Sequence, residues 1–312
     1  MTESNLHNHN PKSQTSDLRA LLNAAETAAY RAGEMIQESW MEPGERQDKG
    51  FRDWVTEADF ASQRIITQYL RERFPEHGFR TEEDNPELPI TGRTLWVIDP
   101  IDGTSNLSRQ QPNFCITLAA VNTAAAAHHQ PSEARAPDAA APDHVEGAHE
   151  AAVLAGVVYD PIRDEMFSAS AGGGSTLNGA PLQVSTVTEL EDALVALDWA
   201  HEHHRREICV EMVGRFIHQV HTARAIGSAA LALAWVAAGR LDAYLNLGLH
   251  PWDMAAGALL IREAGGQLTD WQDRPWLPIE PIEEILASNG QIHQALRRLV
   301  AVEYTVAAPH SD

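Results

Sequence analysis

The segment at positions 96–106, WVIDPIDGTSN, constrains the fold of this chain more than any other. Apolar side chains over 94–98 predict a buried strand. Pro100, which has no N–H to donate, predicts that this strand stops at Asp99. The strand therefore delivers two carboxylates, Asp99 and Asp102, at its end.

A turn that suits anions follows these carboxylates. Gly103 permits a close approach or an unusual backbone dihedral, and Thr104 and Ser105 can start a helix whose N-terminal N–H groups attract an anion. Acidic and anion-binding groups at this spacing need cations between them, as in metal-dependent phosphate transfer. The structural alternative is a strand end with an Asx turn and a helix cap, and the segment by itself permits both.

Three further acidic segments also have a structural alternative each. Asp59, in DWVTEAD, completes a capping box with Thr56. The run at 81–84, TEED, follows a loop with proline and glycine and is typical of a solvated face. Asp253 opens an apolar helix, where an aspartate interacts favourably with the helix dipole.

Charge and cysteine content exclude several classes of protein. The net charge of −21, from 44 acidic and 23 basic residues, argues against binding to nucleic acid or to an anionic membrane surface. Two cysteines make no disulfide framework, so we expect a reducing compartment and a cytoplasmic protein. Residues 1–15 lack the apolar core of a secretory signal, and no uncharged apolar run reaches the roughly 18 residues that span a bilayer.

The order of helix and strand patterns predicts an α/β protein. We expect an N-terminal α+β part over 16–185 that binds metal and phosphate, a C-terminal α/β part over 186–302, and tails at 1–15 and 303–312, the first of them disordered. Predicted helices lie at 17–40, 57–74, 206–220, 228–238, 252–264 and 292–300; predicted strands lie at 94–98, 114–121, 153–159, 193–197, 242–245 and 284–288.

A low-complexity stretch at 123–150 interrupts this order. It holds ten Ala, three Pro and four His but no Ile, Leu, Met, Phe, Tyr or Trp, so it cannot bury enough apolar area to offset the entropy of ordering it. We predict a disordered insertion at a hairpin tip. Non-specific metal binding by its histidines is the alternative.

Taken together and in this order, the motifs resemble the inositol monophosphatase family of magnesium-dependent, lithium-sensitive phosphatases. The resemblance covers about 17–300, apart from the insertion. The matching motifs are DWVTEAD at 53–59, the acidic pair at 82–83, WVIDPIDGTSN at 96–106, NG at 178–179 with LQVS at 182–185, RAIGSAA at 224–230, GRLDAY at 239–244, WDMAAG at 252–257 and EAGG at 263–266.

The resemblance implies a layered αβαβα sandwich with one active site. By motif position, two or three Mg²⁺ ions would be bound by Glu82, Asp99, the carbonyl of Ile101, Asp102 and Asp253. The catalytic residues would be Asp59, Thr104 and Glu82. Phosphate would be held by Gly103 and Thr104, and the rest of the substrate would lie against Asp102, Ala229, Asn246 and Asp253.

The resemblance also implies a reaction. A metal-activated water would hydrolyse a small phosphate monoester, such as inositol monophosphate or a related polyol or sugar phosphate, without a covalent intermediate. Fructose-1,6-bisphosphatase, histidinol-phosphatase and nucleotide 3′-phosphatase activities remain alternatives at the same site. A regulatory, protein-binding role on the same fold is the alternative of another class. A homodimer is expected.

Some residues depart from the family pattern or suggest other chemistry. Thr81 replaces the usual Gly before the acidic pair, which leaves Glu82 or Glu83 as the ligand, and we favour Glu82. Asn246 stands where inositol-specific members usually carry Glu. The HEHH run at 201–204 lacks the spacing of a zinc motif and predicts a polar loop or a helix start. We expect Cys115 and Cys209 in the core; His250, two residues before Trp252, is a candidate for contact with the site but is not assigned to it.

Overall fold

The computed structural model describes residues 11–41, 46–50, 53–123, 153–276 and 280–301. Its larger sheet has seven strands in the order β3-β4-β5-β6-β7-β8-β9, and only the β3–β4 pair is parallel. The strands are β3 (Gly78–Thr81), β4 (Thr94–Asp102), β5 (Cys115–Asn122), β6 (Val153–Asp160), β7 (Glu165–Ser170), β8 (Gly174–Leu177) and β9 (Ala180–Pro181).

Two long helices cover one face of this sheet. Helix α1 (Pro11–Ser39) packs on β5, β6 and β7, while α2 (Glu57–Arg73) packs on β4 and on α1. Alanines on the inner face of α1 are fully buried, and their small side chains let the helix lie close to the sheet. A separate antiparallel hairpin of β1 (Arg46–Gly50) and β2 (Asp53–Thr56) leads into α2.

The second sheet has five strands in the order β11-β10-β12-β14-β13. Strand β10 pairs in parallel with β11 and β12, whereas β14 is antiparallel to both of its neighbours. The strands are β10 (Leu194–Leu197), β11 (Thr222–Arg224), β12 (Ala243–Leu249), β13 (Gln267–Thr269) and β14 (Ile282–Ser288).

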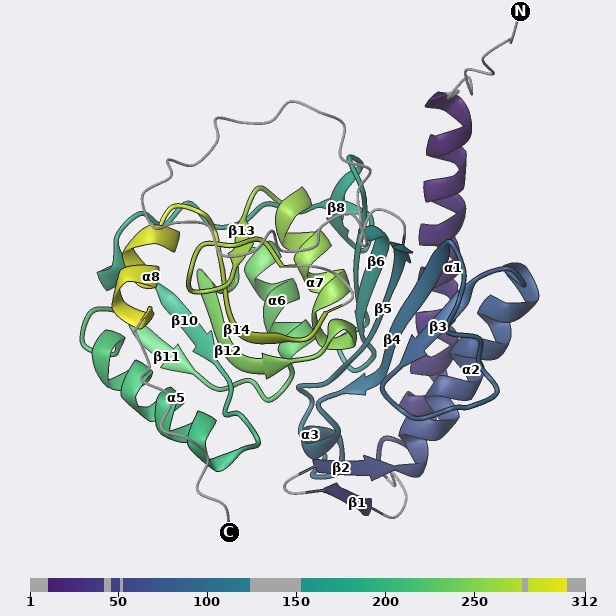
Figure 1. Ribbon diagram of the computed structural model, residues 1–312, viewed down its shortest axis with the longest axis horizontal. Helices are drawn as coiled ribbons and strands as arrows, with labels where there is room; N and C mark the ends of the chain where they lie inside the picture. Colours follow the sequence, from purple (N-terminus) through teal and green to yellow (C-terminus); the bar gives the residue numbers. More distant parts are fainter. Residues whose placement is uncertain (1–10, 42–45, 51–52, 124–152, 277–279, 302–312) are drawn as a thin grey trace, which may run out of the picture.

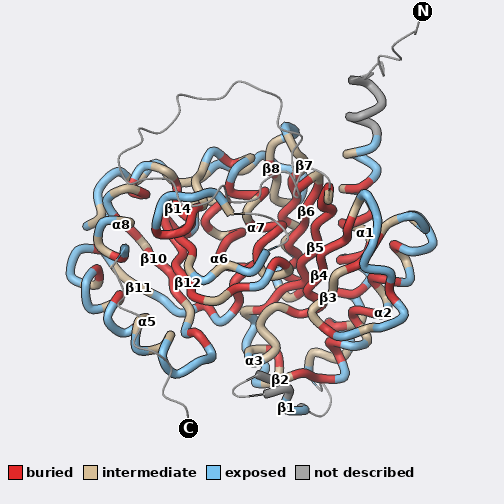
Figure 2. Tube along the Cα trace, viewed as in Figure 1, coloured by how far each residue is buried: buried red, intermediate tan, exposed pale blue. Residues whose placement is uncertain are grey.

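Helices α6 (Ala229–Ala237) and α7 (Pro251–Glu263) lie between the two sheets and contact both (Figure 1). Helix α6 is apolar on every side, as expected for a helix that is buried all round. The outer face of the second sheet is covered by α5 (His203–Phe216) and α8 (His293–Val300). The predicted αβαβα layering is therefore confirmed. Figure 2 shows that the buried residues, in red, are concentrated on the strands of the sheets and on the central helices.

Several predicted boundaries were wrong. The first helix begins at Pro11 and not at 17; proline suits a first helical position because a backbone N–H there would have no partner within the helix. Strand β4 does not stop at Asp99 but continues to Asp102. The sequence analysis missed β1, β2, β3, β7, β8, β9, β11 and β13, all of which have six residues or fewer and show little periodicity.

The predicted insertion lies between β5 and β6, which pair antiparallel, so the two strands that flank it do form a hairpin. Positions 124–152 themselves fall outside the described residues, as do 1–10 and 302–312 of the predicted tails. Within the described part of the chain, no helix has both the length and the apolar character needed to cross a membrane.

Strand β6 and helix α7 lie close together at Gly156, where a Cβ would lie 2.8 Å from the Cα of Ala256. We expect Gly156→Ala to lower the free energy of unfolding by about 1–3 kcal/mol, because sheet and helix must separate. Gly214 of α5 is the matched control, since nothing lies within 4 Å of a Cβ there. Gly214→Ala should be neutral or stabilise by up to about 1 kcal/mol. Urea unfolding measures both, and equal losses would contradict the packing described.

Candidate active site

A cleft of about 1230 Å³ opens where the two sheets and the central helices meet. Its floor is formed by the end of β4, the turn into α3 (Thr104–Leu107), and the first turns of α6 and α7. The β1–β2 hairpin and the loop after β10 line its rim. All residues that were predicted to bind metal, phosphate or substrate line this cleft; Asp59, predicted as catalytic, is buried behind Thr104.

A β-bulge brings the two aspartates of β4 to the same side. Asp99 pairs with Thr117 and Asp102 with Cys115, so three steps along β4 correspond to two along β5. In a regular strand, residues three apart point to opposite faces, and the one extra residue corrects this. Asp99 also accepts a hydrogen bond from the N–H of Ile101 (2.9 Å), which is the Asx turn of the structural alternative.

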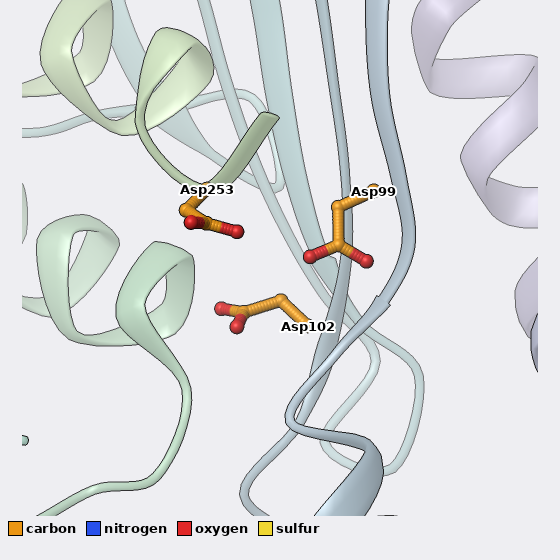
Figure 3. A group of neighbouring side chains, drawn as sticks. All are labelled: Asp99, Asp102 and Asp253. Carbon is orange, nitrogen blue, oxygen red and sulfur yellow. The ribbon is translucent and has the colours of Figure 1, made fainter. Parts of the chain in front are cut away.

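Asp253 of α7 completes an acidic cluster with these two residues. Carboxylate oxygens of Asp99, Asp102 and Asp253 lie within 4.8 Å of one another and converge on one space (Figure 3). Asp253 simultaneously caps α7, because it accepts a hydrogen bond from the N–H of His250 (2.8 Å). Asp253 therefore caps the helix and belongs to the acidic cluster at the same time.

The N-terminus of α6 holds Asp102 in place. Its Oδ2 atom accepts hydrogen bonds from the hydroxyl of Ser228 (2.7 Å) and from the N–H of Ala230 (2.6 Å). Ser228 is also the N-cap of α6. The positive end of a helix dipole therefore faces this carboxylate.

Asp59 likewise has two functions. Its Oδ2 accepts hydrogen bonds from the N–H (2.7 Å) and the hydroxyl (2.6 Å) of Thr56, which is the predicted capping box at the start of α2. Its Oδ1 accepts a hydrogen bond from the hydroxyl of Thr104 (2.8 Å), 45 residues away. The structure thus contains the hydroxyl–carboxylate pair that the resemblance implied.

Glu82 lies among the same carboxylates. Its N–H donates to the carbonyl of Ile98 (3.0 Å), which places it beside the end of β4, and its charge raises the pKa values of Asp59, Asp99 and Asp102. Glu83 is buried, and its carbonyl accepts hydrogen bonds from Gln63 and Thr81. Glu82 therefore acts electrostatically on the cluster.

The turn after β4 requires glycine. Gly103 has φ +100° and ψ 36°, in the left-handed region, and a Cβ would lie 3.0 Å from the carbonyl oxygen of Asn113 and 3.1 Å from that of Gly227. Thr104 directly follows it at the start of α3 and also donates to the carbonyl of Ile101 (3.1 Å).

Ala229 and Asn246 lie on the α6 and β12 side of the cleft. The amide of Asn246 is already engaged: its Nδ2 donates to the hydroxyl of Tyr244 (2.5 Å), and its Oδ1 accepts from the N–H of Leu247 (2.6 Å). The capacity of Asn246 to bind further groups is limited to its second amide hydrogen and its second lone pair.

Burial and mutual repulsion shift the acid–base properties of the cluster. Burial raises the pKa values of Asp59 and Asp102 to about 6 each, from 3.8. The pKa of Asp99 is also raised well above its ordinary value, first because of burial and then because of the charges of Glu82, Asp102 and Asp253. A cation among these groups would offset both causes.

The sequence analysis missed several residues that support the site. Asp198 follows β10, and burial raises its pKa to about 6; Tyr244 donates to it (2.9 Å). The only signal for Asp198 was an acidic residue at the end of a predicted strand. Cys115 is in the core as predicted, but its thiol also lies 3.8 Å from Asp102 and 3.6 Å from Ser228.

The histidines at 201–204, which suggested a zinc site, lie at the start of a helix. The 201–204 run is a helix start as predicted, since α5 begins at His203 with Glu202 as its N-cap. His250 lines the cleft and stacks on Trp252, with ring centroids 4.6 Å apart. Cys209 is fully buried in the core, as expected.

Comparison with known proteins identifies the lineage of this chain. The model of the inositol monophosphatase family matches residues 17–129 and 147–303. The chain belongs to the inositol monophosphatase family. It is 36% identical to the protein named Nus factor SuhB of Escherichia coli over 81% of this chain and 86% of that protein. It is 33% identical to the inositol-1-monophosphatase of Synechocystis sp. over 93% and 92% of the two chains.

The fold of this family member agrees with a solved relative. The crystal structure of the extragenic suppressor protein suhB from Bartonella henselae superposes with a TM-score of 0.78 at 30% identity, covering 91% of this chain and all of the other.

Burial of Asp102, with repulsion from nearby carboxylates, predicts a pH-dependent loss of stability that one substitution relieves. The folded pKa of Asp102 (about 6) exceeds its ordinary value of 3.8, so its ionisation lowers stability as the pH rises from about 4 through 6. In EDTA at pH 7.5, we expect Asp102→Asn to be more stable than the unsubstituted protein by about 1–3 kcal/mol. Its amide oxygen can still accept from Ser228 and Ala230.

Urea unfolding at several pH values measures this difference, which should shrink toward zero at pH 4. Asp160→Asn is the comparison: burial also raises the pKa of that aspartate, but Arg163, outside the cleft, lowers it again in part, so we expect a smaller gain or a loss of stability. A pH-independent gain for Asp102→Asn would refute ionisation of the buried Asp102 as its cause.

Proposed function

We propose that this protein is a Mg²⁺-dependent phosphomonoesterase that hydrolyses inositol monophosphate or a related polyol or sugar phosphate. The observation that carries the proposal is the position of the Asp99, Asp102 and Asp253 cluster beside the Thr104–Asp59 pair. Membership of the inositol monophosphatase family, and the name of the Synechocystis relative, agree with it.

The donor set fits magnesium. We assign Glu82, Asp99, Asp102, Asp253 and the carbonyl of Ile101 as ligands of two or three Mg²⁺ ions; all of them offer oxygen, which Mg²⁺ prefers to nitrogen or sulfur. Bound Mg²⁺ would neutralise phosphate oxygens and lower the pKa of the attacking water. Burial is the first cause of the raised pKa values of Asp99 and Asp102, and repulsion from neighbouring carboxylates adds to it; a bound cation would offset that repulsion.

The residues of the chain itself supply orientation and proton transfer. Thr104 donates its hydroxyl proton to Asp59 Oδ1, so the Thr104 oxygen presents a lone pair that can orient an attacking water. Asp59, with its pKa near 6, can take up a proton close to neutral pH. We assign the N–H groups of Gly103 and Thr104 as the phosphate-binding donors.

The rest of the substrate would lie against Asp102, Ala229, Asn246 and Asp253. Because Asn246 carries no charge and much of its amide is engaged, we favour a hydroxyl-bearing leaving group that needs only one or two hydrogen bonds there. Fructose 1,6-bisphosphate, histidinol phosphate and nucleotide 3′-phosphates stay in the substrate panel as alternatives. A cytoplasmic homodimer remains our expectation for the assembly.

A regulatory role through a protein partner is the second candidate function, and the name of the Escherichia coli relative favours it. The two functions predict different results. A stoichiometric protein partner recovered by affinity purification, together with no turnover on any panel substrate, would support regulation over catalysis.

The substrate panel at fixed Mg²⁺ tests catalysis directly. We expect Mg²⁺-dependent phosphate release, and a decrease of about 10³-fold or more in kcat for Asp99→Asn, because that variant removes a charge needed to hold cations. Asp160→Asn should leave kcat and KM within about twofold, since surroundings outside the site add little to transition-state binding. Equal activity of Asp99→Asn and the unsubstituted protein would remove Asp99 from the mechanism.

The hydroxyl of Thr104 can be tested separately. Thr104→Val removes the donor to Asp59 at nearly constant volume, and we expect kcat to decrease by about 100-fold or more. Thr104→Ser keeps the hydroxyl and should recover most of the rate. If valine and serine variants turn over equally fast, the Thr104–Asp59 pair is structural only.

A further inference from the structure

Asp198 occupies a junction between the two sides of the cleft. It directly follows β10, and its Oδ1 accepts hydrogen bonds from two successive backbone N–H groups, those of Ile226 (2.9 Å) and Gly227 (2.7 Å). Its Oδ2 accepts from the hydroxyl of Tyr244 (2.9 Å), which itself accepts from Asn246. Both oxygens of one carboxylate are therefore used to hold other groups.

The loop that Asp198 binds is also held from the opposite side. The Nδ2 of Asn106, in α3, donates to the carbonyls of Ile226 (3.0 Å) and Gly227 (3.2 Å). Asp198 thus binds the N–H groups, and Asn106 the C=O groups, of the same two residues. We call Ile226–Ser228 the clamped loop.

The clamped loop ends at the group that orients a proposed metal ligand. Ser228 follows Gly227 directly, and its hydroxyl donates to Asp102 Oδ2, as does the N–H of Ala230. A shift of the loop therefore moves the donors that fix Asp102. Asp198 itself lies outside the cluster formed by Asp99, Asp102 and Asp253.

We propose that Asp198 is a positioning residue: through the clamped loop it sets the orientation of Asp102 and thereby the affinity of the site for divalent cations. The inference rests on the proposed cation site. Groups that orient ligands in this way typically change metal affinity by about 10–100-fold when removed.

Loss of a nearby negative charge would also weaken cation binding, and the choice of substitution separates the two causes. Asp198→Ala removes both the charge and the acceptor of the loop N–H groups. Asp198→Asn removes the charge but keeps an oxygen that accepts from Ile226 and Gly227. Tyr244→Phe keeps the charge and removes only the hydroxyl that orients the carboxylate.

Isothermal titration of the full-length chain with Mn²⁺, as a probe for Mg²⁺, measures the affinity without turnover. We expect Asp198→Ala to bind about tenfold more weakly, Asp198→Asn to stay within about twofold of the unsubstituted protein, and Tyr244→Phe to lose about threefold. Circular dichroism and the Tm check the fold of each variant.

Asp242→Ala is the matched control. Asp242 precedes β12 at the opposite end of the same parallel strand pair, and it also accepts hydrogen bonds from a backbone N–H (Leu194, 2.6 Å) and a hydroxyl (Ser185). Its removal should lower the Tm without changing Mn²⁺ affinity.

Several outcomes would overturn the proposal. Unchanged affinity in a folded Asp198→Ala variant would do so, and so would equal losses for Asn and Ala, which would assign the effect to charge alone. If Asp198→Ala does not fold, unchanged affinity in Tyr244→Phe decides against it. Failure of the unsubstituted protein to bind Mn²⁺ would overturn the proposed function, and this inference with it.

Discussion

Repulsion among carboxylates in the cleft is the constraint around which the rest of the molecule is arranged. Three helices begin at this point: Asp59 caps α2, Asp253 caps α7, and Asp102 accepts hydrogen bonds from the first turn of α6. Helices α6 and α7 direct the positive ends of their dipoles toward the acidic cluster, which offsets part of the repulsion. Burial is the first cause of the raised pKa of Asp99, and the charges of Glu82, Asp102 and Asp253 add to it.

Because these carboxylates also cap helices, each acidic segment of the sequence permitted both a structural and a functional interpretation. A capping box and a catalytic carboxylate were alternatives for Asp59, and its geometry permits both: one oxygen accepts from Thr56 in the capping box, and the other accepts from Thr104. Asp253 combines a cap and a place in the cluster in the same way. The layering, the long helices and the central strands were predictable, because periodicity and motif order carry them.

Other features could not be predicted, since they depend on contacts far apart in the chain. The bulge that turns Asp99 and Asp102 to one side is defined by pairing with β5. Asp198 acquires its importance only through Ile226 and Gly227, about 28 residues on. The hydrogen bond from Asn246 to Tyr244 could not be predicted either, because the sequence showed only an uncharged residue in place of glutamate.

The central layer of α6 and α7 has a consequence for how the protein unfolds. Both sheets bury their inner faces against the same two helices, so neither sheet has a complete core without them. Loss of the α6–α7 layer would expose apolar surface on both sides at once, which couples the two halves into one cooperative unit. Amide exchange of β5 and β12, in different sheets, should therefore report a common global opening and not two independent ones.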